Sequence, residues 1–435
     1  MIFSLDVRRA HKGDCLLLHI GSKSDPGLVL IDGGPRDVYL PQLKPRLQKI
    51  KTSQEPLLVD VLMVSHVDDD HIRGILDLTK EEIALNDARR PQLLNVQSFW
   101  HNSFDAIIDE DPKDLTAFFK EQFGEAAASG SGELPQDKIV EVQDESSEDD
   151  PEVVASGLKV LASIEQGFRL RQDADRLEFA RNPEFGGKLI MARKNANAIE
   201  IAHGLKFTVV GPMEPELQAL HKKHIKWLVD LKKKGKSPPA ALAAYVDKSV
   251  ANLSSIVVLA ELEGKRMLLT GDARGDKILK GLQAVGLLAS GSNSKLEIDL
   301  LKVPHHGSAN NLDNDFFERI IAKHYVFSGN GEHGNPEREA LQMLLNARGD
   351  DDYTVHFTYP VSEIDAERKN DWQIQQNREK KRKTNKPDTK VRPNWSPEKH
   401  SLAAVIAAHG DFAERIRIVK AGKPHVIDLL DEVGF

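Results

Sequence analysis

The sequence predicts an α/β fold, in which short buried strands alternate with helices. Apolar runs of strand length recur along the whole chain, and segments of helical pattern separate several of them. In addition, side chains of the kind that bind metals stand directly after several of these runs. The 435 residues suffice for two domains, or for one large domain with insertions.

The first elements are a group of strands, which apolar runs predict at Phe3–Val7, Cys15–Ile20, Leu28–Ile31 and Val59–Val64. A helix is expected to begin at Ile72–Leu78, and a second one to cover Pro336–Ala347. Further strands are predicted at Val96–Trp100, Lys206–Val210, Ser255–Ala260, Arg266–Thr270, Asp299–Val303, Tyr353–Tyr359, Leu402–Ala407 and Ile416–Val419.

The chain is expected to be soluble and cytoplasmic, without contact to a membrane. Its first residues lack the pattern of a signal peptide, and no window approaches the roughly 20 apolar residues that a membrane span requires. The single cysteine, Cys15, excludes an internal disulfide and a zinc cluster built on thiolates. It stands in an apolar run, so we expect it to be buried.

The strongest chemical signal is the segment Ser65–His71, which reads Ser-His-Val-Asp-Asp-Asp-His directly after a predicted strand. Residues i and i+2 of an extended chain project to the same side, so His66 and Asp68 are candidates for one metal. Asp70 and His71 follow where the chain turns into a helix, and they could face a second metal. A helix N-terminus would favour the aspartates without any metal, but it would not explain the two histidines.

Two further motifs also follow predicted strands. Thr270-Gly271-Asp272 would bring to the same sheet edge a carboxylate whose two oxygens could bridge two cations. His305-His306-Gly307-Ser308 combines adjacent histidines with a glycine that permits close approach of the backbone. Each motif alone has an ordinary explanation, as a turn aspartate or as a histidine pair in a surface loop. Their shared position at strand ends favours the joint interpretation as metal ligands.

The order of these motifs resembles the metallo-β-lactamase superfamily. Asp32-Gly33-Gly34 comes first, followed by His-x-Asp-x-Asp-His, Thr-Gly-Asp and His-His-Gly-Ser. Within the superfamily the chain is most similar to the hydrolase domain of bacterial competence (DNA-uptake) channel proteins. Leu5-Asp6-Val7, Gly13-Asp14-Cys15 and Asn252–Val257 carry this closer likeness.

The resemblance implies a metallo-β-lactamase αββα sandwich over residues 1–345, followed by a C-terminal extension over residues 346–435. An acidic insertion at 124–157 interrupts the sandwich, and we expect it to be flexible because it lacks the apolar surface needed to fold alone. The basic segment 373–398 of the extension is expected to be flexible as well.

Carried over by position, the resemblance also implies two divalent metal ions that share one carboxylate. The residues implied as ligands of the first metal are His66, Asp68 and Asp272. Those implied for the second are Asp70, His71, Asp272 and one of the adjacent histidines, with His305 favoured over His306. The residues implied as further ligands, or as orienting the ligands, are His306, Asn252 and Asp32.

Two departures from the superfamily pattern bear on the choice of metal. Many members have histidine at the positions of Asp68 and Asn252, whereas competence-type proteins share both replacements. The first metal position is therefore rich in oxygen ligands, which favours manganese or magnesium more than a site of histidines would. Zn²⁺ and Mn²⁺ are the main candidates, and Mg²⁺ is the third.

The function implied is hydrolysis of phosphodiesters, with nucleic acid (DNA or RNA) as the first substrate, by hydroxide that two metals activate. The expected catalytic residues are Asp70 and His333, although His333 would also suit an exposed loop. The expected substrate contacts are Lys302, Ser308 and His101. The basic stretch between Trp372 and Trp395 adds a physical argument, because cations neutralise phosphates and indoles stack on bases. A solvated linker is the alternative there.

Two other functions stay open, and the net charge of −8 argues weakly against nucleic acid. One is a hydrolase of small molecules such as a lactone, a thioester or a phosphorylated metabolite. The other is a metal-bound, non-catalytic scaffold that binds nucleic acid. The acidic insertion 124–157 could also cover the site as a polyanion until a protein partner moves it or a protease cuts it. An idle surface loop is the simpler interpretation.

Overall fold

The computed structural model describes residues 1–103, 166–218 and 254–434, apart from residues 52, 54, 292, 293 and 386. The acidic insertion 124–157, and with it the proposed partner or protease site, lies outside the described residues, as does Asn252. Within these ranges, no helix has the length and apolar character that crossing a membrane requires.

Six strands form the first sheet, in the order β14-β1-β2-β3-β4-β5. In that order they span Val426–Asp428, Ile2–Val7, Leu16–Gly21, Pro26–Ile31, Leu57–Val64 and Leu94–His101. Neighbours are antiparallel from β14 to β3 and parallel from β3 to β5. The four strands predicted in the first 64 residues are confirmed, and so is the strand predicted at Val96–Trp100.

Eight strands form the second sheet, in the order β13-β12-β11-β10-β9-β8-β7-β6. In that order they span Ile416–Ile418, Thr354–Phe357, Ile320–Phe327, Leu296–Lys302, Lys265–Leu269, Val257–Leu262, Lys206–Gly211 and Ile199–Glu200. Pairing is parallel from β13 to β9 and antiparallel from β9 to β6. Six of these strands match predictions, whereas β11, β6 and, in the first sheet, β14 were not predicted.

One predicted strand is wrong, because Leu402–Ala407 forms the helix α16. The side chain of Ser401 accepts a hydrogen bond from the backbone N–H of Ala404 at 3.0 Å and thereby caps the first turn. Only Leu402 and Val405 of the helix are buried, at a spacing of one helical turn. Three alanines in six residues also favour a helix over a strand.

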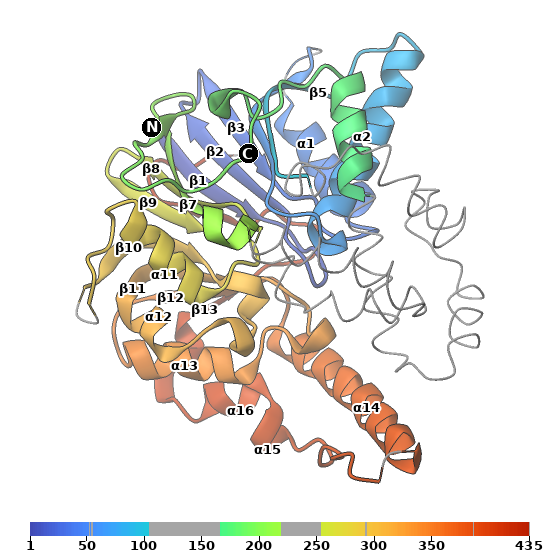
Figure 1. Cartoon of the computed structure of the whole chain (residues 1–435), viewed down its shortest axis with the longest axis vertical. Coiled ribbons are helices and arrows are strands. Elements are labelled where there is room, and N and C mark those ends of the chain that lie inside the picture. Colours follow the sequence, from blue (N-terminus) through green and yellow to red (C-terminus); the bar gives the residue numbers. More distant parts are fainter. Residues whose placement is uncertain are drawn as a thin grey trace.

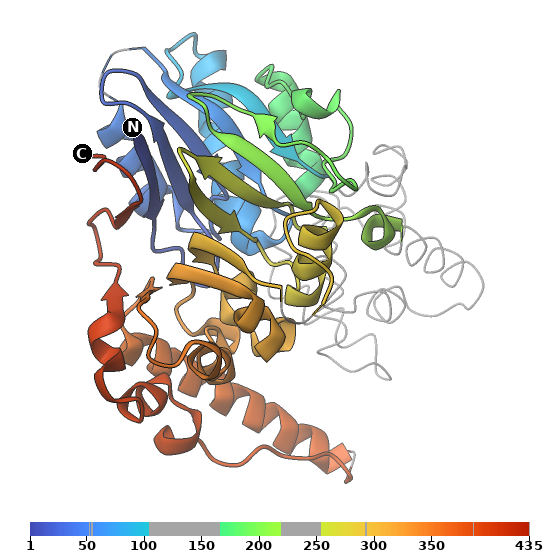
Figure 2. The same cartoon turned by 90° about the vertical axis from the view of Figure 1, so that its left-hand side faces the viewer.

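Three buried apolar clusters place the two sheets face to face, with helices on both outer sides (Figures 1 and 2). Strands of both sheets meet in the central cluster, where the rings of Trp100 and Phe207 lie 5.6 Å apart. The helices against the first sheet are α1 (Lys44–Ile50), α2 (Asp69–Asp87) and a helix at 166–176. Those against the second are α11 (Gly275–Ala284), α12 (Asn314–Arg319), α13 (Arg338–Arg348) and α16. The chain is therefore a mixed α/β fold with two mixed sheets.

Residues 346–435, which we expected as an extension, are built into both sheets. β12 and β13 continue the second sheet, and β14 pairs with β1 in the first. The Met1 ammonium lies 2.5 Å from Asp431, so the N- and C-terminal segments are neighbours (Figure 1). Strands from both sides of the expected boundary at 345 thus pair within the same sheets. These strands are only three or four residues long, which is too short for the sequence pattern to reveal their pairing.

The basic segment 373–398 begins inside a helix. α14 spans Val361–Asn385 and projects from the body of the fold (Figure 2). The chain that follows returns along it: the Trp372 Nε1–H donates to the carbonyl oxygen of Pro393 at 2.8 Å. The ring of Trp372 lies 5.8 Å from that of Trp395 and 4.3 Å from that of His400. Both indoles thus pack against neighbours within the protein, which weakens the argument that they stack on bases.

A row of three histidines connects the two sheets. Nδ1 of His324 on β11 lies 3.1 Å from Nε2 of His356 on β12, and Nδ1 of His356 lies 2.9 Å from Nε2 of His425, just before β14. Burial, with the imidazoles of His425 and His324 beside it, lowers the pKa of His356 to about 2. Burial also lowers the pKa of His324 and of His425. The other charged groups that act on this row are Asp6, Asp299, Lys323, Asp352 and Arg417.

This row makes the fold sensitive to acid. An unfolded histidine binds its proton near pH 6.5, well above the folded pKa of His356, so protons favour the unfolded chain. We expect the melting temperature to fall as the pH drops from 7 to 5, and to fall less in His356→Asn than in the wild type. Thermal unfolding of both proteins across this range tests the prediction, and equal slopes would contradict it.

Candidate metal centre

Four strand ends bring acidic and histidine side chains to one edge of the fold. Asp32 follows β3 and His66 follows β4, and these two strands are parallel neighbours. Asp272 follows β9 and the pair His305-His306 follows β10, which are also parallel neighbours. Carboxyl ends of parallel strands lie at the same sheet edge, and this is where α/β folds commonly bind ligands.

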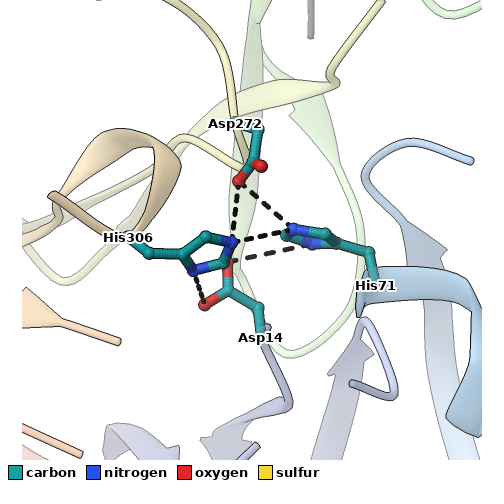
Figure 3. Close-up of side chains that lie close together, drawn as sticks. All are labelled: Asp14, His71, Asp272 and His306. Atoms are coloured by element: carbon teal, nitrogen blue, oxygen red, sulfur yellow. Dashed lines mark hydrogen bonds and ion pairs between the residues drawn. The ribbon is translucent and has the colours of Figure 1, made fainter. Parts of the chain in front are cut away.

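One oxygen of Asp272 contacts two imidazoles within a tight group of side chains (Figure 3). Its Oδ1 is 3.2 Å from Nε2 of His71 and 3.3 Å from Nε2 of His306, and the two imidazole nitrogens are 3.3 Å apart. Oδ2 of Asp70 lies 3.6 Å from the same nitrogen of His306. Asp14 completes the group, because one ligand atom from each of Asp14, His71, Asp272 and His306 lies within 4.8 Å of all the others.

The other oxygen of Asp272 faces a second group. Its Oδ2 is 3.7 Å from Nε2 of His66 and 3.6 Å from Nε2 of His305. The same nitrogen of His66 is 3.7 Å from Oδ2 of Asp68. The two oxygens of one carboxylate thus serve two different sets of imidazoles and carboxylates.

The second of the two adjacent histidines lies where we expected the first. We favoured His305 as the partner of Asp70 and His71, but His306 lies there and His305 lies with His66. Both histidines have left-handed backbone angles, with φ of 48° and 55°. This tight turn directs the two rings to different oxygens of Asp272, with ring planes at 74° to each other. The order of two neighbouring histidines cannot reveal such a turn.

Asp32 orients the His71 imidazole through Nδ1, the nitrogen opposite the one that faces Asp272. One oxygen accepts from the Ser65 backbone N–H at 2.7 Å, and the other accepts from the Ser65 hydroxyl at 2.7 Å and lies 2.8 Å from Nδ1 of His71. This contact occupies Nδ1 and leaves Nε2 of His71 for the group around Asp272. The turn after Asp32 packs directly on α2, where a Cβ on Gly33 would lie 2.4 Å from the backbone nitrogen of Ile75.

Lys302 is not positioned for the substrate contact that we expected. Its side chain is 1% exposed, its ammonium forms an ion pair with Asp14, and it donates to the carbonyl oxygen of Gly271 at 3.3 Å. Asp14 in turn lies 3.6 Å from Nδ1 of His306, which is also 2.9 Å from the Ser328 hydroxyl. Sequence reasoning missed Asp14 as a site residue, since an aspartate in a turn carries no sign of its distant partners.

The other expected substrate contacts also lie away from the group around Asp272. The hydroxyl of Ser308 donates to Glu337 at 3.2 Å. This bond connects the histidine loop, His305 to Ser308, to the start of α13. His101 is 2% exposed and stacks on Phe99 at 5.6 Å. In the part of the chain that the structure describes, no ion pair or hydrogen bond joins His101 to the ligand-type residues.

His333 lies on a turn beside the loop that carries His305 and His306. It is exposed on η5 (Glu332–Gly334), a short helical turn that Asn335 follows directly. The Asn335 side-chain amide donates to the carbonyl oxygen of His305 at 3.4 Å, which fixes this turn beside the histidine loop.

The charges of the centre favour a cation. Burial and the nearby His71 lower the pKa of His66 to about 3, so His66 is neutral at pH 7, as a metal ligand must be. Desolvation, together with the carboxylates of Asp70 and Asp272, raises the pKa of Asp68 to about 7. Burial alone would lower the pKa of His306, but the Asp272 carboxylate outweighs it and raises this pKa to about 10. The carboxylates of the centre therefore attract positive charge, here protons on the imidazoles, which in turn lower the pKa of Asp70 and of Asp272.

Three buried atoms at the centre have no hydrogen-bond partner within the described residues, namely Nε2 of His66, Oδ1 of Asp272 and Oδ1 of Asp14. Buried polar atoms in proteins nearly always have one. Imidazole nitrogens and carboxylate oxygens are the ligands that Zn²⁺ and Mn²⁺ take, so this donor set fits divalent metals.

Comparisons with known proteins leave the family of the chain open. No family model matches it. The chain is 32% identical over 115 residues to microtubule-associated protein 1A of Rattus norvegicus, and 33% identical over 122 residues to that of Mus musculus. The human protein of the same name is 30% identical over 118 residues. Each match covers 26% of this chain but only 4% of the relative, so the chain spans a small part of these proteins.

Proposed function

We propose that this chain is a metal-dependent phosphodiesterase of the metallo-β-lactamase type, with nucleic acid as its first substrate. The observation that carries the proposal is the division of imidazoles and carboxylates between the two oxygens of Asp272. The motifs that supply them follow the order of the superfamily they resemble. Two facing sheets with helices outside are compatible with an αββα sandwich.

The proposed ligands form two sets that share Asp272. The first set is His66, Asp68, His305 and Asp272, and the second is Asp70, His71, His306 and Asp272. Two bound divalent cations would lower the pKa of a water molecule toward neutrality and offset the charge of a phosphate. The protein holds the ligands in place: Asp32 orients His71, and Asp14 with Ser328 orients His306. The exposed His333, on the turn beside His305, is the proposed contact to the substrate.

A long polyanionic substrate would meet cations at the outer end of α14, away from the centre. α14 packs against η5, where the Arg368 guanidinium donates to the carbonyl oxygen of Gly334 at 3.0 Å. From there the helix leads outward to a basic end, where the exposed cations include Lys380, Lys381 and Lys383. Cations of this kind neutralise backbone phosphates and release counterions, which supports nucleic acid over a small metabolite.

The proposal is tested with a nuclease assay in Mn²⁺, Mg²⁺ and Zn²⁺ on circular DNA, linear DNA and RNA. We expect Asp70→Ala to reduce cleavage by about a hundred-fold or more, because a ligand of the second set is lost. The matched control is Asp69→Asn, whose carboxylate is exposed and accepts from Gln166 at 3.0 Å. It should cut like the wild type.

The other outcomes are equally informative. Binding of two metals without cleavage of any nucleic acid would indicate a hydrolase of small molecules or a metal-bound scaffold. No bound metal under any condition would overturn the proposal.

A separate prediction concerns Asp32, which contacts His71 but would not touch the metal. Asp32→Asn should weaken metal binding by about ten- to a hundred-fold, because the imidazole loses the carboxylate that orients it. Titration of the metal-free protein with Zn²⁺ measures the affinity, and thermal unfolding checks that the variant folds. An unchanged affinity would show that Asp32 serves only the packing of the turn.

A further inference from the structure

The outer part of α14 projects away from both sheets and is strongly basic. We call the α14 arm the helix beyond Arg368 together with the chain 387–396 that returns along it (Figures 1 and 2). Between Asn377 and Asn394 the sequence carries eight basic residues and two acidic ones, although the whole chain has a net charge of −8. The arm is therefore a local surface that attracts polyanions.

The returning chain fixes the arm from one side. The Gln376 side-chain amide donates to the carbonyl oxygen of Arg392 at 3.0 Å. Glu379 accepts from the backbone N–H of Arg392 at 2.7 Å and from its Nε–H at 2.9 Å. The Arg392 guanidinium also lies over the ring of Trp372, 5.0 Å from its centroid. A helix without such support is marginal in water, so these contacts give the arm one shape before a partner binds.

The opposite side of the helix is left to solvent. Asn370, Ile374, Asn377 and Lys381 are all exposed, and their spacing of four, three and four residues places them on one face of α14. Ile374 is 42% exposed, so it adds little to the packing of the arm. This face offers two amides, one aliphatic side chain and one ammonium, and none of the four carries a negative charge.

The lysines of the arm are available to an anion. Lys381, Lys383 and Lys390 are exposed and form no ion pair with any residue that the structure describes. The nearby Glu379 is already paired with Arg392 at 2.8 Å. Ammonium groups of this kind bind phosphates favourably, because binding releases the counterions of the nucleic acid.

The arm suits double-stranded nucleic acid better than single strands. Proteins that hold single strands stack the bases on aromatic side chains. The two aromatic residues of the arm, Trp372 and Trp395, pack against each other and against His400. By contrast, a helix about 10–12 Å across fits the major groove of B-DNA, which is about 12 Å wide. Asparagine amides bind adenine edges in that groove, and apolar side chains contact the methyl group of thymine.

We propose that the α14 arm binds double-stranded DNA, with the face that carries Asn377 in the major groove and the lysines on the flanking phosphates. This inference rests on the proposed function, because it names the form of the nucleic-acid substrate.

The test measures the fluorescence anisotropy of labelled DNA titrated with the full chain in the presence of a chelator. The ligands are a duplex of about 30 base pairs, roughly three helical turns, and one of its single strands. The wild type should bind the duplex more tightly by about ten-fold or more. The triple variant Lys381→Gln, Lys383→Gln and Lys390→Gln should weaken duplex binding about a hundred-fold and reduce its salt dependence by about three phosphate contacts. The matched control is Lys280→Gln, which changes an exposed lysine on α11 and should bind like the wild type.

Two further measurements locate the contact in the major groove. Asn377→Ala should weaken duplex binding several-fold and leave its salt dependence unchanged, because an amide releases no counterion. The major-groove dye methyl green should compete with the protein, whereas the minor-groove ligand netropsin should not. Thermal unfolding establishes that each variant folds. If the triple variant does not, Asn377→Ala and the competition with the two groove ligands still decide the matter.

Four results would overturn the inference: equal binding of duplex and single strand, unchanged affinity in the triple variant, unchanged affinity in Asn377→Ala, or competition by netropsin alone. Binding of a polyglutamate peptide as tightly as the duplex would indicate a site for acidic proteins and would overturn it as well.

The inference and the proposed function can fail separately. The chelator removes the metals, so binding is measured without cleavage. A preference for the duplex without cleavage of any nucleic acid in Mn²⁺, Mg²⁺ or Zn²⁺ would overturn the proposed function alone. Metal-dependent cleavage with equal binding of both forms of DNA would overturn the inference alone.

Discussion

Asp272→Ala is expected to remove both metals at once and to lower phosphodiester hydrolysis by roughly a thousand-fold or more. Its two oxygens face different groups: Oδ1 lies 3.3 Å from Nε2 of His306, and Oδ2 lies 3.7 Å from Nε2 of His66. No other carboxylate among the described residues contacts imidazoles of both groups. Losing it should therefore disrupt both proposed sites.

The metal content of the purified variants distinguishes the loss of both metals from the loss of a ligand at one metal site only. Elemental analysis should find about two metals per chain in the wild type, close to none in Asp272→Ala and about one in Asp70→Ala. The half-exposed Asp315, paired with Arg319 on α12, offers a control at which Asp315→Asn should change nothing. Retention of one metal by Asp272→Ala would show that the two sets do not depend on a shared carboxylate.

Lys302→Met is expected to lower the free energy of unfolding by about 3–5 kcal/mol, the largest effect on stability that we predict. Lys302 and Asp14 are each 1% exposed and form an ion pair beneath the metal centre. Methionine fills a similar volume but leaves the Asp14 carboxylate buried and without its cation. The histidines nearby compensate only in part, since Asp14 lies 3.6 Å from His306 and 3.9 Å from His71.

Urea unfolding of three variants separates the charge from the packing. Asp14→Asn with Lys302→Met removes both charges and should recover most of the lost stability. Asp14→Asn alone leaves the ammonium unpaired and should be destabilised like Lys302→Met. If the double variant were as unstable as the sum of the two single variants, the loss would come from packing and not from the unpaired charge.

The sequence by itself determined most strands and the residue types of the centre. Apolar runs predict β1 to β4 because almost every residue of these strands is buried. A buried strand of this kind can be recognised from a few consecutive residues. The ligand-type motifs stand at strand ends, and parallel strands bring their carboxyl ends together. For this reason residue order alone was enough to assign His66, Asp70, His71 and Asp272 to one site.

Only the tertiary structure decided which atoms meet. The left-handed turn at His305 and His306 sets which imidazole joins His71, and a backbone angle of this kind leaves no trace in residue order. Lys302 carries the positive charge expected of a substrate contact. The fold nevertheless buries it against Asp14, which comes from a distant part of the sequence. β14 pairs with β1 across almost the whole sequence. Contacts between distant segments depend on how the sheets pack, and local patterns of hydrophobicity do not encode that packing.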